Sequence, residues 1–125
     1  MGNRNSFVLV LVSEMISKKA EELRAAVTCR IITHTVNNPI KSKVLEKLYG
    51  ISGTTVREII HHQRTEYNHP IASDANGYYM ARSSEELQHT IAQLRSRVKH
   101  IDAAATALEH CLFKGRLFRQ QSLPF

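Results

Sequence analysis

Several residue types that constrain a fold or carry chemistry are scarce in this sequence. It has no tryptophan and few aromatic residues, which predicts a small aliphatic core. Its two cysteines, Cys29 and Cys111, are far apart and lack CxxC spacing, so we expect reduced thiols in a cytoplasmic protein. The apolar run Phe7–Val12 has six residues, which is too short for a signal peptide or a membrane span.

Motifs for metal binding and catalysis are also missing. His61 and His62 are adjacent and therefore point in different directions on a helix, and none of the seven histidines forms an HxxxH or HExxH pair. The chain has no nucleophile elbow, no phosphate-binding loop and no pair of carboxylates placed for acid–base chemistry. We therefore expect no metal site, no cofactor and no enzymatic activity.

Positive charge is what the sequence does have. Its 125 residues carry a net charge of +6, with a pI near 9.6. This length suits one domain with an extra element. A basic protein favours an anionic partner, of which nucleic acid is the commonest, although many small helical proteins are basic for solubility alone.

The first predicted helix follows an N-terminal leader. Apolar residues from Leu23 to Val36 roughly follow helical spacing, which predicts a helix from Ser17 to Thr35. The helix should end before Pro39, because proline disfavours helical geometry in the residue before it. We expect residues 1–16 to form an appended leader that packs weakly.

Two shorter helices are predicted next. Ser42 is expected to cap the first, which runs over Lys43–Tyr49 and ends at Gly50 in a left-handed conformation. Ser52 is expected to cap the second, which extends to Arg64. Two helices joined by about three residues, with glycine at the turn, form a helix-turn-helix motif.

A β-hairpin completes the predicted domain. His69–Ala72 and Tyr78–Ala81 have the pattern of short strands, and Asn76-Gly77 between them supplies the positive φ angles of a tight turn. Ile40 is expected to add a short strand. Helix, helix and hairpin in this order are typical of a winged helix, which we assign to residues 17–82.

The segment from Ile31 to Ala81, with "GISGTTVREIIHHQR" and "HPIASDANGYYM", resembles the winged-helix domain that begins the bacterial biotin repressor, and short DNA-binding proteins of phages and prophages. The markers of the resemblance are Gly50–Ser52, Val56, Ile59, Ile60, Arg64 and Gly77-Tyr78. It implies that the second helix of the pair lies in the major groove and that the hairpin rests on the DNA backbone. Gln63 departs from the pattern, because a leucine usually faces the core there. The last turn of that helix should therefore fray or pack against a polar group.

The exposed residues of the second helix are candidates for DNA contacts. Thr54 and Thr55 lie at its N-terminal end, which enters the groove most deeply, and Arg57 is placed to bind guanine or phosphate. Glu58 either accepts a hydrogen bond from cytosine or turns aside into an ion pair. The histidines would donate to phosphates, more readily at lower pH, and the lysines of the preceding helix would contact phosphates without reading sequence. The predicted DNA-binding residues, each of which has ordinary solvation as its alternative, are Lys41, Lys43, Ser52, Thr54, Thr55, Arg57, Glu58, His61, His62, Arg64 and Asn76, with Lys47 as a further phosphate contact.

A long helix is predicted over residues 83–113. Ser83 caps it, and apolar residues then recur at steps of four and three, as in a coiled coil. These predicted dimerisation residues are Leu87, Ile91, Leu94, Val98, Ile101, Ala105, Leu108 and Leu112. About 29 residues at about 1.5 Å each make a helix about 43 Å long, more than a small domain can cover. We expect its start to pack on the winged helix and the rest to form a homodimer, with Arg97 facing Asp102 of the second chain.

Residues 114–125 are predicted to form a basic tail. Its last six residues resemble the peptides by which bacterial proteins bind the replicative sliding clamp, with Gln120, Leu123 and Phe125 in the anchoring positions. Gln121 stands where that pattern has leucine. The alternative is a tail that packs on the domain or has no binding role.

These features predict a mainly α fold with a small β-hairpin: a winged helix-turn-helix followed by a long C-terminal coiled-coil helix. The first functional hypothesis is a cytoplasmic transcriptional regulator of phage or prophage type, which binds double-stranded DNA sequence-specifically as a homodimer. The second is a replication accessory factor whose tail recruits the host sliding clamp. The third is a winged helix that binds protein. No membrane partner is expected.

Overall fold

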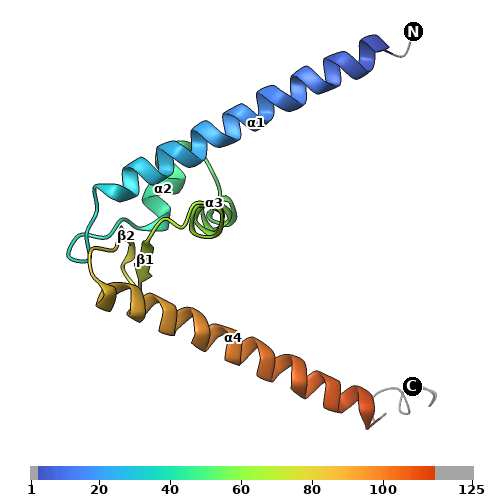
Figure 1. Cartoon of the computed structure of the whole chain (residues 1–125). Coiled ribbons are helices and arrows are strands. Elements are labelled where there is room, and N and C mark those ends of the chain that lie inside the picture. The colour runs from blue at the N-terminus through green and yellow to red at the C-terminus, as the bar shows by residue number, and fades with distance from the viewer. Residues whose placement is uncertain (1–2, 115–125) are drawn as a thin grey trace. The chain divides into compact units, whose positions relative to one another are not determined.

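The computed structural model describes residues 3–114, which form four helices and one β-hairpin (Figure 1). The elements are α1 (Asn3–Ile32), α2 (Ser42–Tyr49), α3 (Gly53–Glu66), β1 (Ile71–Asp74), β2 (Gly77–Met80) and α4 (Ser84–Phe113). This mainly helical fold, with a two-stranded antiparallel hairpin and a long last helix, confirms the predicted fold class. Contacts group the residues up to Leu87 into one compact unit and those from Gln88 onward into another.

Helix α1 is longer than the sequence predicted. The prediction placed its start at Ser17 and left residues 1–16 as a leader, but the structure has one uninterrupted helix from Asn3. No glycine or proline occurs between Asn3 and Ile32, so nothing breaks the helix where the apolar run ends. The predicted end at Thr35 was also wrong by one turn, because the backbone N–H of His34 bonds the carbonyl of Ile31 in a closing turn.

The caps around the central turn are partly as predicted. Gly50 ends α2 in the left-handed conformation (φ 62°), and the Ser52 side chain accepts a hydrogen bond from the backbone N–H of Thr55, so both of these predictions are confirmed. The predicted Ser42 cap was wrong. Lys41 occupies the cap position without a side-chain bond, and the Ser42 hydroxyl instead donates to Glu46 Oε2 at 3.0 Å.

The hairpin forms close to the predicted place, with strands shifted by one or two residues. Ser73 pairs with Tyr78, and Asp74 with Gly77, around a two-residue turn. Ile40 joins as an isolated bridge, because it exchanges two backbone hydrogen bonds of 2.8 Å with Tyr78. The expectation that both Asn76 and Gly77 take positive φ was wrong, since only Gly77 does (φ 139°).

The core of the first unit is small and mainly aliphatic, although Tyr79 is also buried. Its buried cluster is Val27, Ile31, Ile40, Leu45, Val56, Ile59, Ile60 and Ile71. Gln63 also lies inside, only 5% exposed, and its Nε2 donates to the hydroxyl of Thr28 at 2.6 Å. The expected polar partner for this glutamine is therefore Thr28 of α1, and the last turn of α3 is anchored to that helix.

Among residues 3–114 no helix combines the length and the apolar character that crossing a membrane requires.

Candidate nucleic-acid interface

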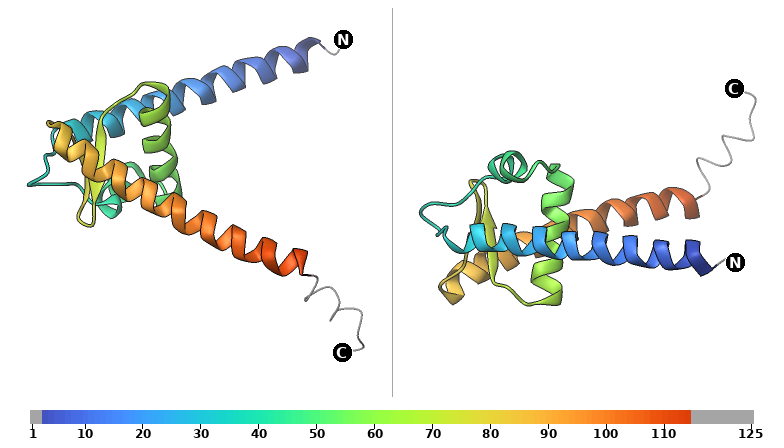
Figure 2. Two further views of the ribbon diagram at one scale, coloured as in Figure 1. Left: turned by 60° about the horizontal axis from the view of Figure 1, so that its bottom comes forward. Right: turned by 90° about the horizontal axis from the view of Figure 1, so that it is seen from above.

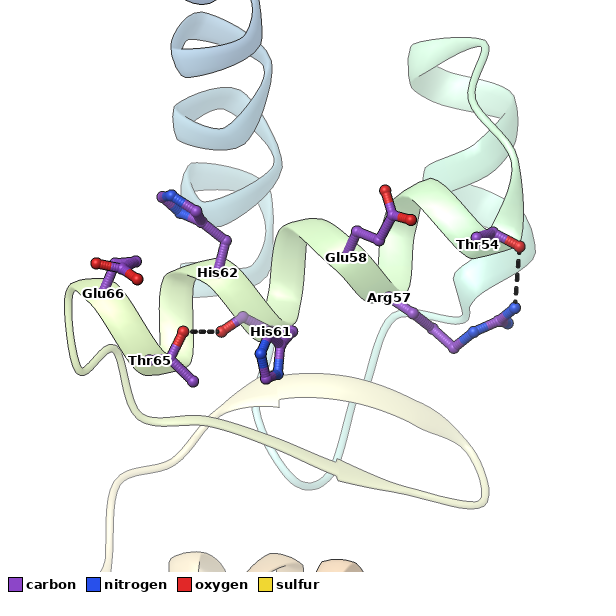
Figure 3. A pocket seen from close by; sticks show the side chains of 7 residues that line it. All are labelled: Thr54, Arg57, Glu58, His61, His62, Thr65 and Glu66. Atoms are coloured by element: carbon purple, nitrogen blue, oxygen red, sulfur yellow. Dashed lines mark hydrogen bonds between the residues drawn. The ribbon is translucent and has the colours of Figure 1, made fainter.

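One side of α3 is fixed in the core and the other faces outward. The buried side consists of Val56, Ile59, Ile60 and Gln63. The opposite side forms a shallow hollow lined by Thr54, Arg57, Glu58, His61, His62, Thr65 and Glu66 (Figure 3). The helix therefore presents a polar surface whose position is set by the packing behind it.

The lining residues form two rows along the helix. The first, called the α3 row from here on, consists of Thr54, Arg57, His61 and Thr65; the second, the acidic row, consists of Glu58, His62 and Glu66. Within each row the residues are three or four apart, which places them on one side of a helix. Figure 3 shows His61 and Thr65 pointing to one side of α3 and Glu58, His62 and Glu66 to the other. The α3 row contains no carboxylate, whereas the acidic row contains two.

The hydroxyls at the start of α3 have different partners. Ser52 and Thr55 share a hydrogen bond of 3.0 Å between their side chains, and both act in the cap. Thr54 and Arg57 are exposed, and Arg57 Nη2 donates to the Thr54 hydroxyl at 3.2 Å. An exposed bond of this kind is readily exchanged for one to a ligand, so Thr54 and Arg57 are better placed for binding than Ser52 and Thr55.

The two histidines are not equivalent. His61 is exposed and lies in the α3 row. His62 is half-buried, with its ring centroid 5.7 Å from that of Tyr67 and its Nδ1 3.4 Å from Gln63 Oε1. His61 is therefore the histidine that a ligand on α3 would meet first.

Arg64 contacts the hairpin. Its Nε donates to the carbonyl of Ile71 at 2.9 Å, and its Nη2 donates to the Ser73 hydroxyl at 3.3 Å. The sequence placed Arg64 among the DNA contacts. In the structure its guanidinium joins the end of α3 to β1 and so sets the position of the hairpin relative to the helix.

The remaining predicted contacts lie at the surface. Lys41, Lys43 and Lys47 are all exposed on and before α2. Asn76 is exposed in the hairpin turn, and its backbone N–H donates to Asp74 Oδ1 at 2.7 Å. These side chains are available to a partner, and the lysines add positive charge next to α3, whose two arginines are balanced by Glu58 and Glu66.

Thr65 and Glu66 were missed by the sequence analysis, although both line the hollow. The signal was present, because Thr65 follows His61 by four residues and Glu66 follows His62 by four. Both residues were left out because the predicted helix ended at Arg64.

The heptad residues of α4 after Leu87 lie in the second unit and are mostly exposed. Six of them are more than a third exposed, with Ile101 at 70% and Leu108 at 71%. Leu87, which belongs to the first unit, is half-buried, and Ala105 is exposed. The predicted clamp-binding residues Gln120, Leu123 and Phe125 lie outside the described residues.

No model of a known protein family matches the chain, and comparison with curated proteins and with solved structures gave no match either. Its function has therefore to be inferred from its own residues. Within residues 3–114 no group of three or more histidines, cysteines or carboxylates is placed to hold a metal ion.

Proposed function

We propose that the chain binds double-stranded DNA with α3 in the major groove. The observation that carries this proposal is the α3 row, in which donors without a carboxylate line one side of a helix held by a buried core. The major groove admits an α-helix, and its base edges offer a distinct set of acceptors and donors for each base pair. Arg57 would bind guanine or a phosphate, and Thr54 and His61 would contact the neighbouring positions.

Lysines of α2 and the hairpin would hold the helix in register on the DNA. Lys41, Lys43 and Lys47 supply charge for phosphate contacts, which position a protein without reading sequence. Arg64 supports this arrangement indirectly, because it fixes the hairpin against α3. Asn76 in the turn would then reach the backbone beside the groove.

Pairing of α4 with the same helix of a second chain would make the DNA-binding protein a dimer. Its apolar stripe keeps the heptad spacing and is exposed over most of its length. A helix that exposes such a stripe is stabilised by a partner helix with the same repeat. A dimer of this kind suits a palindromic operator, and we propose a cytoplasmic transcriptional regulator of phage or prophage type.

One observation favours the protein-binding alternative. Glu58 and Glu66 of the acidic row border the α3 row, and carboxylates repel a phosphate backbone. A basic protein partner would instead be attracted to them. Substitution of both glutamates separates the two functions, because Glu58→Gln with Glu66→Gln should strengthen DNA binding and weaken binding to a basic protein.

The test is selection of bound duplexes from a random pool, followed by titration of the enriched sequence at two salt concentrations. Arg57→Ala should weaken binding to that sequence about 5- to 150-fold, since one good base contact contributes about 1–3 kcal/mol. Lys43→Ala should lower affinity for all duplexes and reduce the slope of log affinity against log salt by about one.

A matched control is Lys18→Ala, which removes one positive charge from an exposed position of α1 that is not in the hollow. It should change the affinity for the enriched duplex by less than about twofold, as expected for a distant surface charge. An unenriched pool, or equal losses in Arg57→Ala and Lys18→Ala, would contradict groove reading by α3.

A further inference from the structure

The N-terminal half of α1 is exposed and largely apolar, and its residues 7–12 are apolar on all sides. Its large apolar residues are Phe7, Val8, Leu9, Val10, Leu11, Val12, Met15 and Ile16, with exposed fractions that reach 65% at Phe7 and 68% at Leu9. Figures 1 and 2 show this half running out from α2, α3 and the hairpin, on which the other half of α1 packs. Every residue from Asn5 to Lys19 is exposed.

This apolar surface continues the face by which α1 enters the core. Val27 is fully buried. Leu9 precedes it by 18 residues and Ile16 by 11, which are about five and about three helical turns at 3.6 residues per turn. Both therefore fall on the side of α1 that the domain covers further along, but at a point the domain does not reach.

The area involved is that of a protein interface. A fully buried aromatic side chain covers about 150–250 Å², so a partly exposed apolar side chain contributes roughly 100 Å². Eight such side chains expose on the order of 800 Å². Monomeric proteins rarely expose a contiguous apolar patch of more than a few hundred Å². About 800 Å² from each partner is what a standard stable interface buries.

A lipid surface fits this segment poorly. A helix that lies in a membrane interface needs a polar side facing water, and residues 7–12 have none. The run of six apolar residues is also much shorter than the roughly 20 residues of a membrane span.

We infer that the N-terminal half of α1 is a self-association segment whose partner is the same segment of a second copy, in antiparallel orientation about Val12. One surface used by both copies satisfies a two-fold axis. Parallel pairing on the Leu9–Ile16 side would carry the second helix into the space that the domain occupies beside Val27. In the antiparallel arrangement the second helix runs away from the domain, and Leu9 faces Ile16 of the partner subunit.

Val12 is the expected centre because it is the midpoint of the exposed stretch from Asn5 to Lys19. This segment lies at the opposite end of the sequence from α4, so one chain would carry two separate self-association elements. The inference is independent of DNA binding, since no residue of the α3 hollow belongs to the segment.

The first experiment measures the mass of the full chain in solution by sedimentation for wild type and three variants. Leu9→Glu with Ile16→Glu disrupts association through α1, and Ile101→Glu disrupts association through α4. The third variant combines all three changes. We expect Ile101→Glu to remain associated through α1 and the combined variant to be a single chain. Lys18→Glu, on the side of α1 away from Leu9 and Ile16, is the control and should match wild type.

Two results would overturn the inference. One is that Ile101→Glu is a single chain at every concentration at which wild type associates. The other is that Leu9→Glu with Ile16→Glu has no effect in the Ile101→Glu background. If α4 does not pair, Ile101→Glu should have the same mass in solution as wild type, and Leu9→Glu with Ile16→Glu alone should give single chains. Failure of the α4 dimer is therefore distinguishable from failure of the α1 inference.

Cross-linking tests the orientation, in a full chain with Cys29→Ser, Cys111→Ser and Ile101→Glu. Antiparallel pairing about Val12 predicts that Val12→Cys cross-links to itself, and that Leu9→Cys cross-links to Ile16→Cys when the two variants are mixed. Efficient self-cross-linking of Leu9→Cys would indicate parallel pairing and overturn the register. Flotation with neutral lipid vesicles should leave wild type unbound, and binding that Leu9→Glu with Ile16→Glu abolishes would assign the segment to membranes instead.

Discussion

Gly77 is the residue at which a single missing side chain decides whether the hairpin can form. Its φ of 139° is unfavourable for any residue with a Cβ, and a Cβ built there would lie 2.3 Å from the carbonyl oxygen of Ile40. Such a distance is far below van der Waals contact. Because Ile40 exchanges two backbone hydrogen bonds with Tyr78, the obstacle is backbone that is held in place.

Gly77→Ala should therefore destabilise the domain strongly, by about 2–4 kcal/mol, which combines a strained φ with a clash. Chemical denaturation followed by circular dichroism measures the change. Gly53→Ala is the matched control, because a Cβ at Gly53 would meet its nearest atoms, in the Arg57 and Glu46 side chains, at an ordinary 3.5 Å. If the two variants lose equal stability, the close approach of Ile40 is not what requires glycine at position 77.

The buried hydrogen bond between Gln63 and Thr28 is a second place where single residues determine the stability of the domain. Gln63 Nε2 donates to the Thr28 hydroxyl, and that hydroxyl donates to the carbonyl of Arg24 at 2.9 Å. Thr28→Val leaves the amide of Gln63 buried without its acceptor, which should cost about 1–3 kcal/mol. Adding Gln63→Leu removes the unsatisfied donor, so the double variant should be more stable than Thr28→Val alone. Additive losses in urea unfolding would show that the two side chains do not act as a pair.

At the scale of elements, the parts that were predicted correctly are those governed by local hydrogen bonds. The Gly50 and Ser52 caps follow from residues within one turn. So does the start of α4, where Glu86 N–H donates to Ser83 Oγ and the Ser83 hydroxyl donates back to the Glu86 carboxylate. The start of α1 was missed because an apolar run without polar periodicity was interpreted as a leader, although nothing in it interrupts a helix.

The candidate site was predicted only as far as helical periodicity reaches. Spacing identified Thr54, Arg57 and His61 as exposed residues of one helix but did not separate them from Thr55, Glu58 and His62. The role of Arg64 depends on Ile71 and Ser73, which the turn after α3 brings back beside it. That contact is tertiary, so no pattern within the helix could have revealed it. Likewise, His62 differs from His61 because of its contact with Tyr67.

The proposed pairing of α4 between two chains can be tested by substitutions within that one helix. Ile101→Glu places a charge in the centre of the proposed seam, and a buried unpaired charge costs about 3–5 kcal/mol, so the dissociation constant of that pairing should rise at least about 100-fold. Ser96→Glu is the control, since it lies at the outward heptad position and is exposed. Measured in a chain with Leu9→Glu and Ile16→Glu, equal dissociation of both variants would contradict the heptad seam.

For the whole molecule, the surface proposed to bind DNA and the α4 face proposed to pair two chains lie in different units. The first unit carries the α3 hollow and the lysines of α2, whereas the second carries an apolar helix face without a counterpart among the described residues of that unit. In the proposed function, a single α3 row would read only a few base pairs, which is too little for a unique genomic site. Association of chains would supply the missing specificity by engaging two sites at once.

This reasoning gives a prediction about the DNA that the protein selects. The enriched sequence should be a palindrome whose half-sites are about one helical turn, or a multiple of it, apart. On a single half-site, wild type and Ile101→Glu should bind with similar affinity, because the groove contacts are the same. On the paired site, compared in chains that carry Leu9→Glu and Ile16→Glu so that α1 cannot hold two copies together, the chain with Ile101 should bind about 100-fold or more tightly than the chain with Ile101→Glu, because its second contact is intramolecular. Inserting about five base pairs between the half-sites, half of a turn of about ten, should remove that advantage.

Both duplexes are titrated at one salt concentration, since phosphate contacts make every affinity salt-dependent. If Ile101→Glu has no effect on the paired site in that background, α4 contributes nothing to recognition, and α3 must read its sequence one chain at a time.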